Sequence, residues 1–337
     1  MIVLGLTLVL SALFCGLYLR LARRLQILDM PNERSSHERP TPHGGGTPMM
    51  MALTLGFVAA SYFQGGFPDF YMGLLLGALV LCALGVLDDI HELPASLRFV
   101  VYALVCGYLL LSYLPTVLPL LPQALFVVVL LIAWLWLINL YNFMDGIDGI
   151  AGTQCLLAAG GAALLSSWLW GGIGNYAYFC LLLAASQLGF LLWNWPPARL
   201  FMGDAGSIPT GMLAGGLALI GQVTGSLPGI CWLILLAVFI TDATLTLLRR
   251  IVRGERFLEA HRTHAYQRLA RHWGSHRRVD ILLIAINLLW LDQNRYRRYQ
   301  QAGPAHVAKN FSPESQTSQV ESVLARCALR GTNRQAA

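Results

Sequence analysis

The chain contains few charged residues and almost no lysine. Only 12% of its 337 residues are charged, whereas 56% are hydrophobic, and the mean hydropathy is +0.59. These values exclude the soluble globular class and are typical of an integral membrane protein. Lys309 is the single lysine among 23 basic residues. Coding bias alone would explain this, but any phosphate contact from a basic side chain before the tail must then come from arginine or histidine.

The sequence also lacks a cysteine framework and a convincing secretory leader. Its seven cysteines are mostly isolated within apolar runs, so we expect small hydrophobic residues rather than disulfides or metal ligands. The first apolar run ends in Arg20, Arg23 and Arg24, the reverse of the charge order in a signal peptide. We therefore expect residues 1–20 to form a retained membrane helix.

Apolar segments of about 20 residues, the length that crosses a bilayer, recur along most of the chain. The predicted fold is an all-α integral membrane protein, a polytopic bundle of about ten transmembrane helices. Connections with nearly all the arginine alternate with short connections that carry no basic residue, so the arginine side faces the cytoplasm and the N-terminus lies outside. The predicted helices cover 1–20, 46–63, 70–87, 97–114, 123–140, 150–169, 176–193, 207–222, 230–248 and, more briefly, 280–291.

A polar segment, N-L-Y-N-F-M-D-G-I-D-G at residues 139–149, directly follows one of these apolar runs. Carboxamides and carboxylates are costly at membrane depth, so their presence favours a functional role. Gly146 and Gly149 would allow the helix to unwind near the interface and direct the polar side chains into one pocket. An ordinary polar loop between two helices is the alternative. The four polar residues, spaced three apart, are Asn139, Asn142, Asp145 and Asp148.

Carboxylates also follow other helices on the arginine side. Asp88 and Asp89 are adjacent, and such a pair either raises one pKa or recruits a cation. Carboxylate oxygens favour Mg²⁺, with Mn²⁺ as an alternative. Asp204, in M-G-D-A-G-S, could close this metal site or could act only as the N-cap of the next helix. The alternative for Asp88 and Asp89 is that both are solvated residues at the membrane interface without a metal. A further acidic residue, Asp242, is expected to pair with Arg249.

Two further clusters could contact phosphate. His261 and His264 are spaced to share one helix face, and with Arg262 they predict a phosphate-facing cluster. Zinc ligation and a basic helix lying on anionic lipid are the alternatives. In the first arginine-side loop, Gly44 and Gly45 belong to a G-G-G triplet whose backbone N–H groups could bind phosphate, although the triplet could also be a flexible linker.

Five motifs in this sequence occur in a fixed order. They are R-P-T-P-H-G-G-G (39–46), D-D-I (88–90), N-x-x-N-x-x-D-G-I-D-G (139–149), F-M-G-D-A-G-S (201–207) and H-R-T-H-A-Y-Q (261–267). This series resembles the polyprenyl-phosphate N-acetylhexosamine-1-phosphate transferases, classed as glycosyltransferase family 4. The resemblance covers roughly residues 1–290 and is strongest to the branch that initiates O-antigen synthesis.

The resemblance implies transfer of N-acetylhexosamine 1-phosphate from a UDP-N-acetylhexosamine to undecaprenyl phosphate, giving the undecaprenyl-diphosphate-sugar and UMP, with Mg²⁺. It implies that Asp88 deprotonates the lipid phosphate and that Asp89 and Asp204 hold the metal. We expect direct attack by the lipid phosphate rather than a phospho-enzyme. The residues implied for the nucleotide and catalytic segment are Asn142, Asp145 and Asp148, and those implied near the diphosphate and sugar are His261 and His264.

The sequence departs from the family after the transferase domain, residues 1–291. The tail, 292–337, is polar and non-periodic and is predicted to be disordered. Because 280–291 is short for a span, we hypothesise a truncated or frame-shifted C-terminus.

Two rival classes fit less well. A transporter or flippase would place polar groups near the bilayer midplane, whereas here they gather at one interface. A CDP-alcohol phosphotransferase needs a D-G-x-x-A-R series, and this chain has D-G-I-D-G-I-A-G. The expected location is the bacterial inner membrane with the site facing the cytoplasm. A homodimer is compatible with this prediction, and no nucleic-acid partner is expected.

Overall fold

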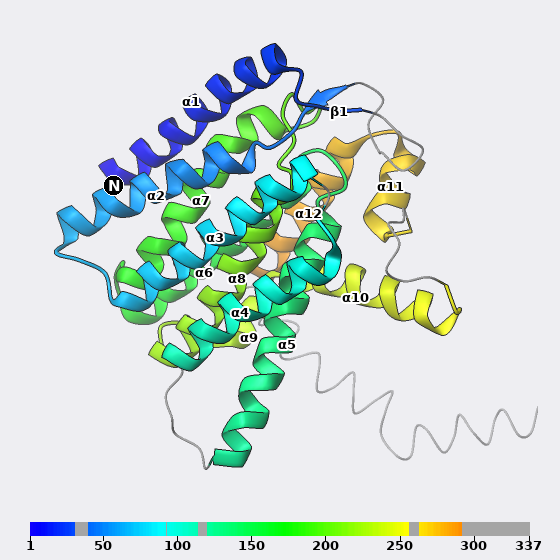
Figure 1. The fold of residues 1–337 in the computed structure, drawn as a ribbon. Helices are drawn as coiled ribbons and strands as arrows, with labels where there is room; N and C mark the ends of the chain where they lie inside the picture. Colours follow the sequence, from blue (N-terminus) through cyan, green and yellow to red (C-terminus); the bar gives the residue numbers. More distant parts are fainter. Residues whose placement is uncertain (31–39, 92, 114–119, 256–262, 292–337) are drawn as a thin grey trace, which may run out of the picture. The chain divides into compact units, whose positions relative to one another are not determined.

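The structure, a computed structural model, describes residues 1–30, 40–91, 93–113, 120–255 and 263–291 (Figure 1). The chain divides into one compact unit, Met1–Ile284, and a second, Ala285–Ala337. The predicted tail, 292–337, lies outside the described residues. The elements are α1 (Ile2–Leu25), β1 (Leu28–Asp29), β2 (Thr41–Pro42), α2 (Gly46–Gln64), α3 (Asp69–His91), α4 (Ala95–Tyr113), α5 (Leu120–Met144), α6 (Ile150–Trp170), α7 (Asn175–Asn194), α8 (Asp204–Thr224), α9 (Gly229–Leu235), α10 (Ala237–Val252), α11 (Ala265–Trp273) and α12 (His276–Leu291).

The described part of the chain is almost entirely helical, as predicted, and the protein is a multi-pass membrane protein. Among the described residues, seven helices are long and apolar enough to cross a bilayer, and α9 with α10, which meet at a 73° bend, would make an eighth span if they cross together. The predicted number of about ten is not confirmed. The segments predicted at 207–222 and 280–291 form α8 and α12, which are not among those seven helices.

Helices far apart in the sequence pack closely because glycines allow their backbones to approach. α1 packs against α2 and α7, and α3 and α5 both pack against α8 (Figure 1). A Cβ atom on Gly189 of α7 would lie 2.4 Å from the carbonyl oxygen of Leu8 in α1. A Cβ atom on Gly85 of α3 would lie 2.5 Å from the backbone nitrogen of Ala205 in α8. These contacts bring the last turn of α3 against the first turn of α8.

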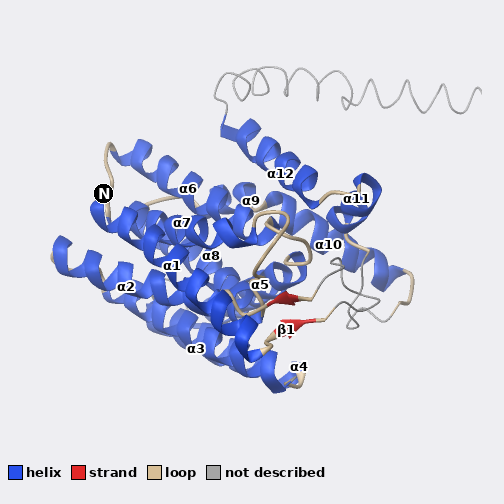
Figure 2. Ribbon diagram, turned by 90° about the horizontal axis from the view of Figure 1, so that it is seen from above, coloured by secondary structure: helices blue, strands red, loops and turns tan. Residues whose placement is uncertain are grey.

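A short backbone ladder joins the loops at this end of the helices. β1 and β2 form a two-stranded antiparallel sheet, which Figure 2 shows beside the helical body. The Phe201 N–H donates to the Pro42 carbonyl over 2.8 Å, and the Gly45 N–H donates to the Phe201 carbonyl over 2.9 Å. The Gly46 N–H donates to the Met202 carbonyl, also over 2.9 Å. The loop before α2 and the loop before α8 are therefore held side by side.

Candidate active site

An arginine links two of the predicted acidic residues. Arg98, in the first turn of α4, donates from Nη1 to Oδ2 of Asp88 and, over 3.1 Å, to Oδ2 of Asp204. The other Asp88 oxygen accepts from the Leu93 N–H over 2.7 Å. Because α3, α4 and α8 each contribute one of these side chains, the contact assembles a charged cluster from segments more than one hundred positions apart.

Asp204 lies at the centre of this cluster. Its Oδ1 accepts a hydrogen bond of 2.7 Å from Nδ2 of Asn142, which also lies 3.0 Å from Oγ of Ser207. Burial, a hydrogen bond shared with Asp88 and the negative charge of Asp89 raise the pKa of Asp204 to about 7. The alternative role as an N-cap is wrong, since Gly203 is the N-cap of α8 and makes no side-chain cap.

Asp89 lies beside the cluster and has one carboxylate oxygen without a hydrogen-bond partner. Its Oδ2 is buried without a hydrogen-bond partner, and Nδ1 of His43 lies 3.9 Å away. A buried carboxylate oxygen without a donor is unfavourable unless a cation approaches it. The donor set therefore fits Mg²⁺, which commonly takes one or two carboxylates and leaves its other positions to water and substrate phosphate. Among the described residues, no group of three or more His, Cys, Asp or Glu side chains is arranged to hold a metal ion, so water and substrate phosphate would have to supply the remaining ligands.

The segment between α5 and α6 unwinds as predicted. α5 ends at Met144, α6 begins at Ile150, and Gly149 has a φ of 79°. Burial, followed by the negative charges of Asp204, Asp89 and Asp148, raises the pKa of Asp145 well above its ordinary value. The polar end of α5 therefore adds Asp145 to the same negative environment as Asp204.

The four polar residues of this segment do not all share one set of contacts. Oδ2 of Asp148 accepts from the Ala198 N–H over 3.0 Å and lies 3.3 Å from Nδ1 of His276. The Asn139 amide donates over 2.7 Å to the Leu135 carbonyl of its own helix. The prediction that all four turn into one pocket is therefore wrong for Asn139, because α5 continues past it and its own backbone satisfies the amide.

The histidine motif is only partly within the described residues. His261 and Arg262 lie outside them. His264 is the N-cap of α11 and has extended backbone angles, and the helix face that we predict it to share with His261 lies outside the described residues. Its Nδ1 lies 3.5 Å from Oδ1 of Asp242, whose carboxylate also accepts the N–H groups of Ala265 and Tyr266 over 2.9 and 3.0 Å.

Asp242 does not pair with Arg249, in contrast to our expectation. The two residues are seven positions apart on α10, which separates them by about 10 Å along the helix axis. The Asp242 carboxylate instead joins α10 to the start of α11 through the contacts given above. It is a positioning residue for His264.

The glycine triplet also serves a different purpose from the one predicted. The Gly45 and Gly46 N–H groups donate to the carbonyls of Phe201 and Met202, so they do not form a free phosphate nest. Gly44 and Gly45 are buried, and a Cβ atom on Gly46 would lie 2.1 Å from Cα of Gly206. Cβ atoms on Gly44 and Gly45 would instead lie 2.4 Å from the hydroxyl oxygen of Tyr18 and 2.7 Å from Cε2 of Phe190, so close packing excludes side chains at all three positions.

The structure brings in residues that the sequence interpretation missed. Arg98 bridges two carboxylates, His43 faces Asp89, and His276 and the fully buried Asp280 lie against the turn that carries Asp148. One signal could have identified Arg98, since it is the only lysine or arginine between positions 40 and 198. The other three become neighbours of the motifs only through tertiary packing.

Comparison with known proteins connects this geometry to a family. The model of "Glycosyl transferase family 4" matches residues 71–222. Over these residues the chain is similar to this family. The family match runs from α3 to the last turn of α8, so it includes the five aspartates of the site. Those residues are Asp88, Asp89, Asp145, Asp148 and Asp204.

Several individual proteins are similar to this chain over most of its length. A probable undecaprenyl-phosphate N-acetylglucosaminyl 1-phosphate transferase of Bacillus subtilis is 28% identical over 287 residues, which cover 80% of this chain and 77% of the relative. A decaprenyl-phosphate N-acetylglucosaminephosphotransferase of Mycobacterium leprae is 29% identical, covering 83% and 79%. An undecaprenyl-phosphate alpha-N-acetylglucosaminyl 1-phosphate transferase of Thermotoga maritima is 28% identical, covering 82% and 84%.

Proposed function

We propose that the protein transfers N-acetylhexosamine 1-phosphate from a UDP-N-acetylhexosamine to undecaprenyl phosphate. The products would be undecaprenyl-diphosphate-N-acetylhexosamine and UMP, in an initiating step of O-antigen or other cell-envelope polysaccharide synthesis. The observation that carries the proposal is the gathering of carboxylates from α3, α8 and the α5–α6 turn around Arg98, at one end of an apolar helical bundle. The names of the relatives support transfer of an N-acetylglucosamine 1-phosphate group to a polyprenyl phosphate.

The reaction brings two anions, the lipid phosphate and the diphosphate of the nucleotide sugar, into contact, and their repulsion must be reduced. An oxygen of the lipid phosphate attacks the β-phosphorus of the nucleotide sugar, the bond from that phosphorus to the bridging oxygen breaks, and UMP leaves with the electron pair. Like charges repel strongly where water is scarce. Bound Mg²⁺ would supply charge neutralisation for the phosphates, and Asp89 and Asp204 are the residues that would hold it.

The remaining residues have roles that follow from their contacts. Asp88 is the proposed base for the lipid phosphate, and Arg98 fixes its carboxylate beside Asp204. Asn142 orients Asp204 through its amide. His264, which Asp242 positions, and Asp145 are placed by the proposal near the diphosphate. Direct attack predicts inversion at a chiral β-phosphorus, and net retention would instead require a phospho-enzyme.

The proposed setting follows from charge and composition. The polar end of the bundle would face the cytoplasm of a bacterial inner membrane, because the arginine-rich loops lie there. The lipid tail would then remain in the bilayer while its phosphate reaches the interface. A homodimer is compatible with this arrangement.

The proposal is tested with purified protein, undecaprenyl phosphate, several UDP-N-acetylhexosamines and Mg²⁺, by measuring UMP and the lipid-linked sugar. We expect both products in equal amounts and no turnover when EDTA removes the metal. Asp204→Asn should abolish turnover, whereas Asp69→Asn, at the opposite and exposed end of α3, should leave it unchanged. Lipid binding without UMP release from any donor would favour a flippase and refute the transferase.

A further inference from the structure

A buried tyrosine of α11 contacts the turn between α5 and α6. Tyr266 is 4% exposed, and its hydroxyl donates a hydrogen bond of 3.0 Å to the carbonyl oxygen of Phe143. That carbonyl lies in the last turn of α5, where backbone carbonyls have no partner within the helix itself. Tyr266 therefore supplies a donor to the end of α5 at the point where the helix unwinds.

The same hydroxyl also lies against the other side of Asp145. A Cβ atom on Gly146 would lie 2.1 Å from the hydroxyl oxygen of Tyr266. The φ angle of Gly146 is outside the left-handed region, so space rather than backbone conformation requires glycine here. Because Phe143 and Gly146 flank Asp145 in the chain, Tyr266 holds the backbone on both sides of this carboxylate.

The hydroxyl of Tyr266 keeps its proton. Burial, followed by the negative charges of Asp145 and Asp242, raises the pKa of Tyr266 well above its ordinary value. Hydrogen bonds from the Gly146 backbone and the Gln267 side chain offset only part of this increase. At neutral pH the hydroxyl is therefore a donor, as the bond to the Phe143 carbonyl requires.

Tyr266 also contacts the histidine motif. Its ring stacks on the ring of His264, with centroids 5.7 Å apart and 28° between the planes. The backbone of this segment is fixed by Asp242, which accepts the N–H groups of Ala265 and Tyr266 over 2.9 and 3.0 Å. A carboxylate is favourable there because the first N–H groups of a helix lack partners within it. Tyr266 thus connects two motifs that are more than one hundred positions apart in the sequence.

We propose that Tyr266 is a positioning residue, which fixes the turn carrying Asp145 against α11 and holds it at a constant distance from His264. The inference rests on the proposed function, in which Asp145 and His264 lie near the diphosphate of the nucleotide sugar. Tyr266 acts through these two residues and does not touch the substrate. The rate of a chemical step depends steeply on the geometry of the groups that perform it.

The expected effect is on the chemical step rather than on binding. Loss of the hydroxyl lets the turn move without removing a group that binds substrate, so the KM values should stay unchanged. One neutral hydrogen bond corresponds to a decrease of about threefold to tenfold in kcat.

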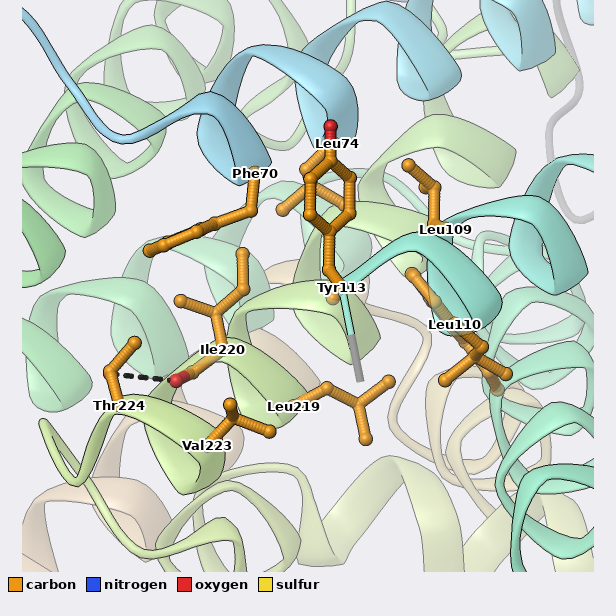
Figure 3. A pocket seen from close by; sticks show the side chains of 11 residues that line it. Phe70, Leu74, Leu109, Leu110, Tyr113, Leu219, Ile220, Val223 and Thr224 are labelled. Carbon is orange, nitrogen blue, oxygen red and sulfur yellow. Dashed lines mark hydrogen bonds between the residues drawn. The ribbon is translucent and has the colours of Figure 1, made fainter. Parts of the chain in front are cut away.

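The matched control is a buried tyrosine at the other end of the bundle. The hydroxyl oxygen of Tyr176, in α7, accepts a hydrogen bond of 2.6 Å from Nε1 of Trp232. A Cβ atom on Gly221 would lie 2.8 Å from this oxygen, and Gly221 follows Asp204 by seventeen positions on α8, about 26 Å along the axis. Figure 3 shows this far end of α8, where Ile220 lines an apolar pocket.

The kinetic experiment uses the full chain and the transferase assay described above, at a temperature at which every variant is folded. Tyr266→Phe should lower kcat about threefold to tenfold, with unchanged KM for undecaprenyl phosphate and for the UDP-sugar. Tyr176→Phe also removes a buried hydroxyl and should lower the unfolding temperature without changing kcat. A wild-type kcat in Tyr266→Phe, a loss confined to KM, or an equal loss of kcat in Tyr176→Phe would overturn the proposal.

A rescue experiment tests the contact itself. Gly146→Ala should lower kcat about 10- to 30-fold, because the turn and the tyrosine ring must move apart. Tyr266→Phe removes the oxygen that the new methyl group meets, so the double variant should have a higher kcat than Gly146→Ala alone, although each change lowers kcat by itself. Losses that multiply in the double variant would overturn the proposal.

Hydrogen exchange in detergent does not depend on turnover. Peptides that cover residues 144–150 should exchange faster in Tyr266→Phe than in the wild type, and Tyr176→Phe should leave them unchanged. Unchanged exchange in Tyr266→Phe would overturn the positioning role even if the transferase assay succeeds. Faster exchange would support it even if no UDP-sugar is turned over, a result that would refute only the proposed function.

Discussion

Removal of Arg98 should weaken catalysis more than any other single change outside the aspartates. In Arg98→Ala, Asp88 keeps the Leu93 N–H, Asp204 keeps the Asn142 amide, and the two carboxyl groups keep the hydrogen bond that they share. The two carboxyl groups would then lie next to each other in a poorly hydrated site without the guanidinium that binds both. The metal and the substrate phosphates would meet a less ordered and more strongly repelling pair.

The magnitude follows from the number and exposure of the bonds lost. A hydrogen bond to a charged partner contributes about 1.5–3 kcal/mol, and Arg98 makes two. Its side chain is 29% exposed and the Asp204 side chain 25% exposed, so solvent weakens the sum. We expect a net loss of about 2–3 kcal/mol, which corresponds to a decrease of about 30- to 150-fold in kcat/KM. Arg98→Lys keeps the charge but not the planar fork, so its loss should be intermediate.

The assay is UMP release from a UDP-N-acetylhexosamine with undecaprenyl phosphate, measured as kcat/KM across pH. Loss of the guanidinium should raise the pKa of Asp204 further above about 7, so the acid limb of the profile should move to higher pH. Arg24→Ala, an exposed arginine in the last turn of α1, is the control. A kcat/KM of Arg98→Ala within threefold of the wild type, with an unmoved acid limb, would refute this account of the bridge.

Three further predictions concern the same region. Asp89→Asn should increase the Mg²⁺ concentration needed for half-maximal activity by at least about tenfold, because the orphan oxygen becomes a weaker ligand; an unchanged metal titration would contradict the assignment. Burial and the charge of Asp148 raise the pKa of Asp280 from 3.8 to about 8, so stability should decrease as the pH rises from about 4 to about 8. Asp280→Asn should remove this pH dependence from thermal unfolding in detergent and should raise the free energy of unfolding by about 3–5 kcal/mol at pH 9. If the stability of the variant and that of the wild type change with pH in the same way, this explanation is excluded. Gly203→Ala should lower the free energy of unfolding by about 1–3 kcal/mol, because φ at this position is 71° and the new Cβ atom would lie 3.0 Å from Oδ2 of Asp89. An unchanged free energy of unfolding would show that this loop relaxes around the new side chain.

The features that were predictable from the sequence are those determined by local pattern. Apolar runs located most helices to within a few residues, for example 46–63 against the observed α2, because membrane depth sets a minimum length for such runs. Unwinding after Met144 was also predictable, since glycines flank the carboxylates there. That the acidic residues gather at one end followed from the alternation of arginine-rich and neutral loops.

The predictions that were wrong concern residues whose contacts are made with distant parts of the chain. The side-chain amide of Asn139 and the backbone N–H of Gly45 each donate a hydrogen bond to a carbonyl group of the protein. The local sequence does not show which carbonyl group lies within reach. Asp242 is bound by the start of α11 rather than by the arginine two turns away on its own helix. His43 meets Asp89 only because the loop before α2 is paired with the loop before α8.

That pairing has a consequence for biosynthesis. Pro42, Gly45 and Gly46 find their partners at Phe201 and Met202, about 155 to 160 positions later in the chain. While the ribosome is still making the intervening helices, the first loop has nothing to bind, and α3 ends in two acids with no α8 to meet them. A chain that ends before residue 201 would therefore lack both the ladder and the acidic cluster, since the loop before α8 and the first turn of α8 supply the partners for both.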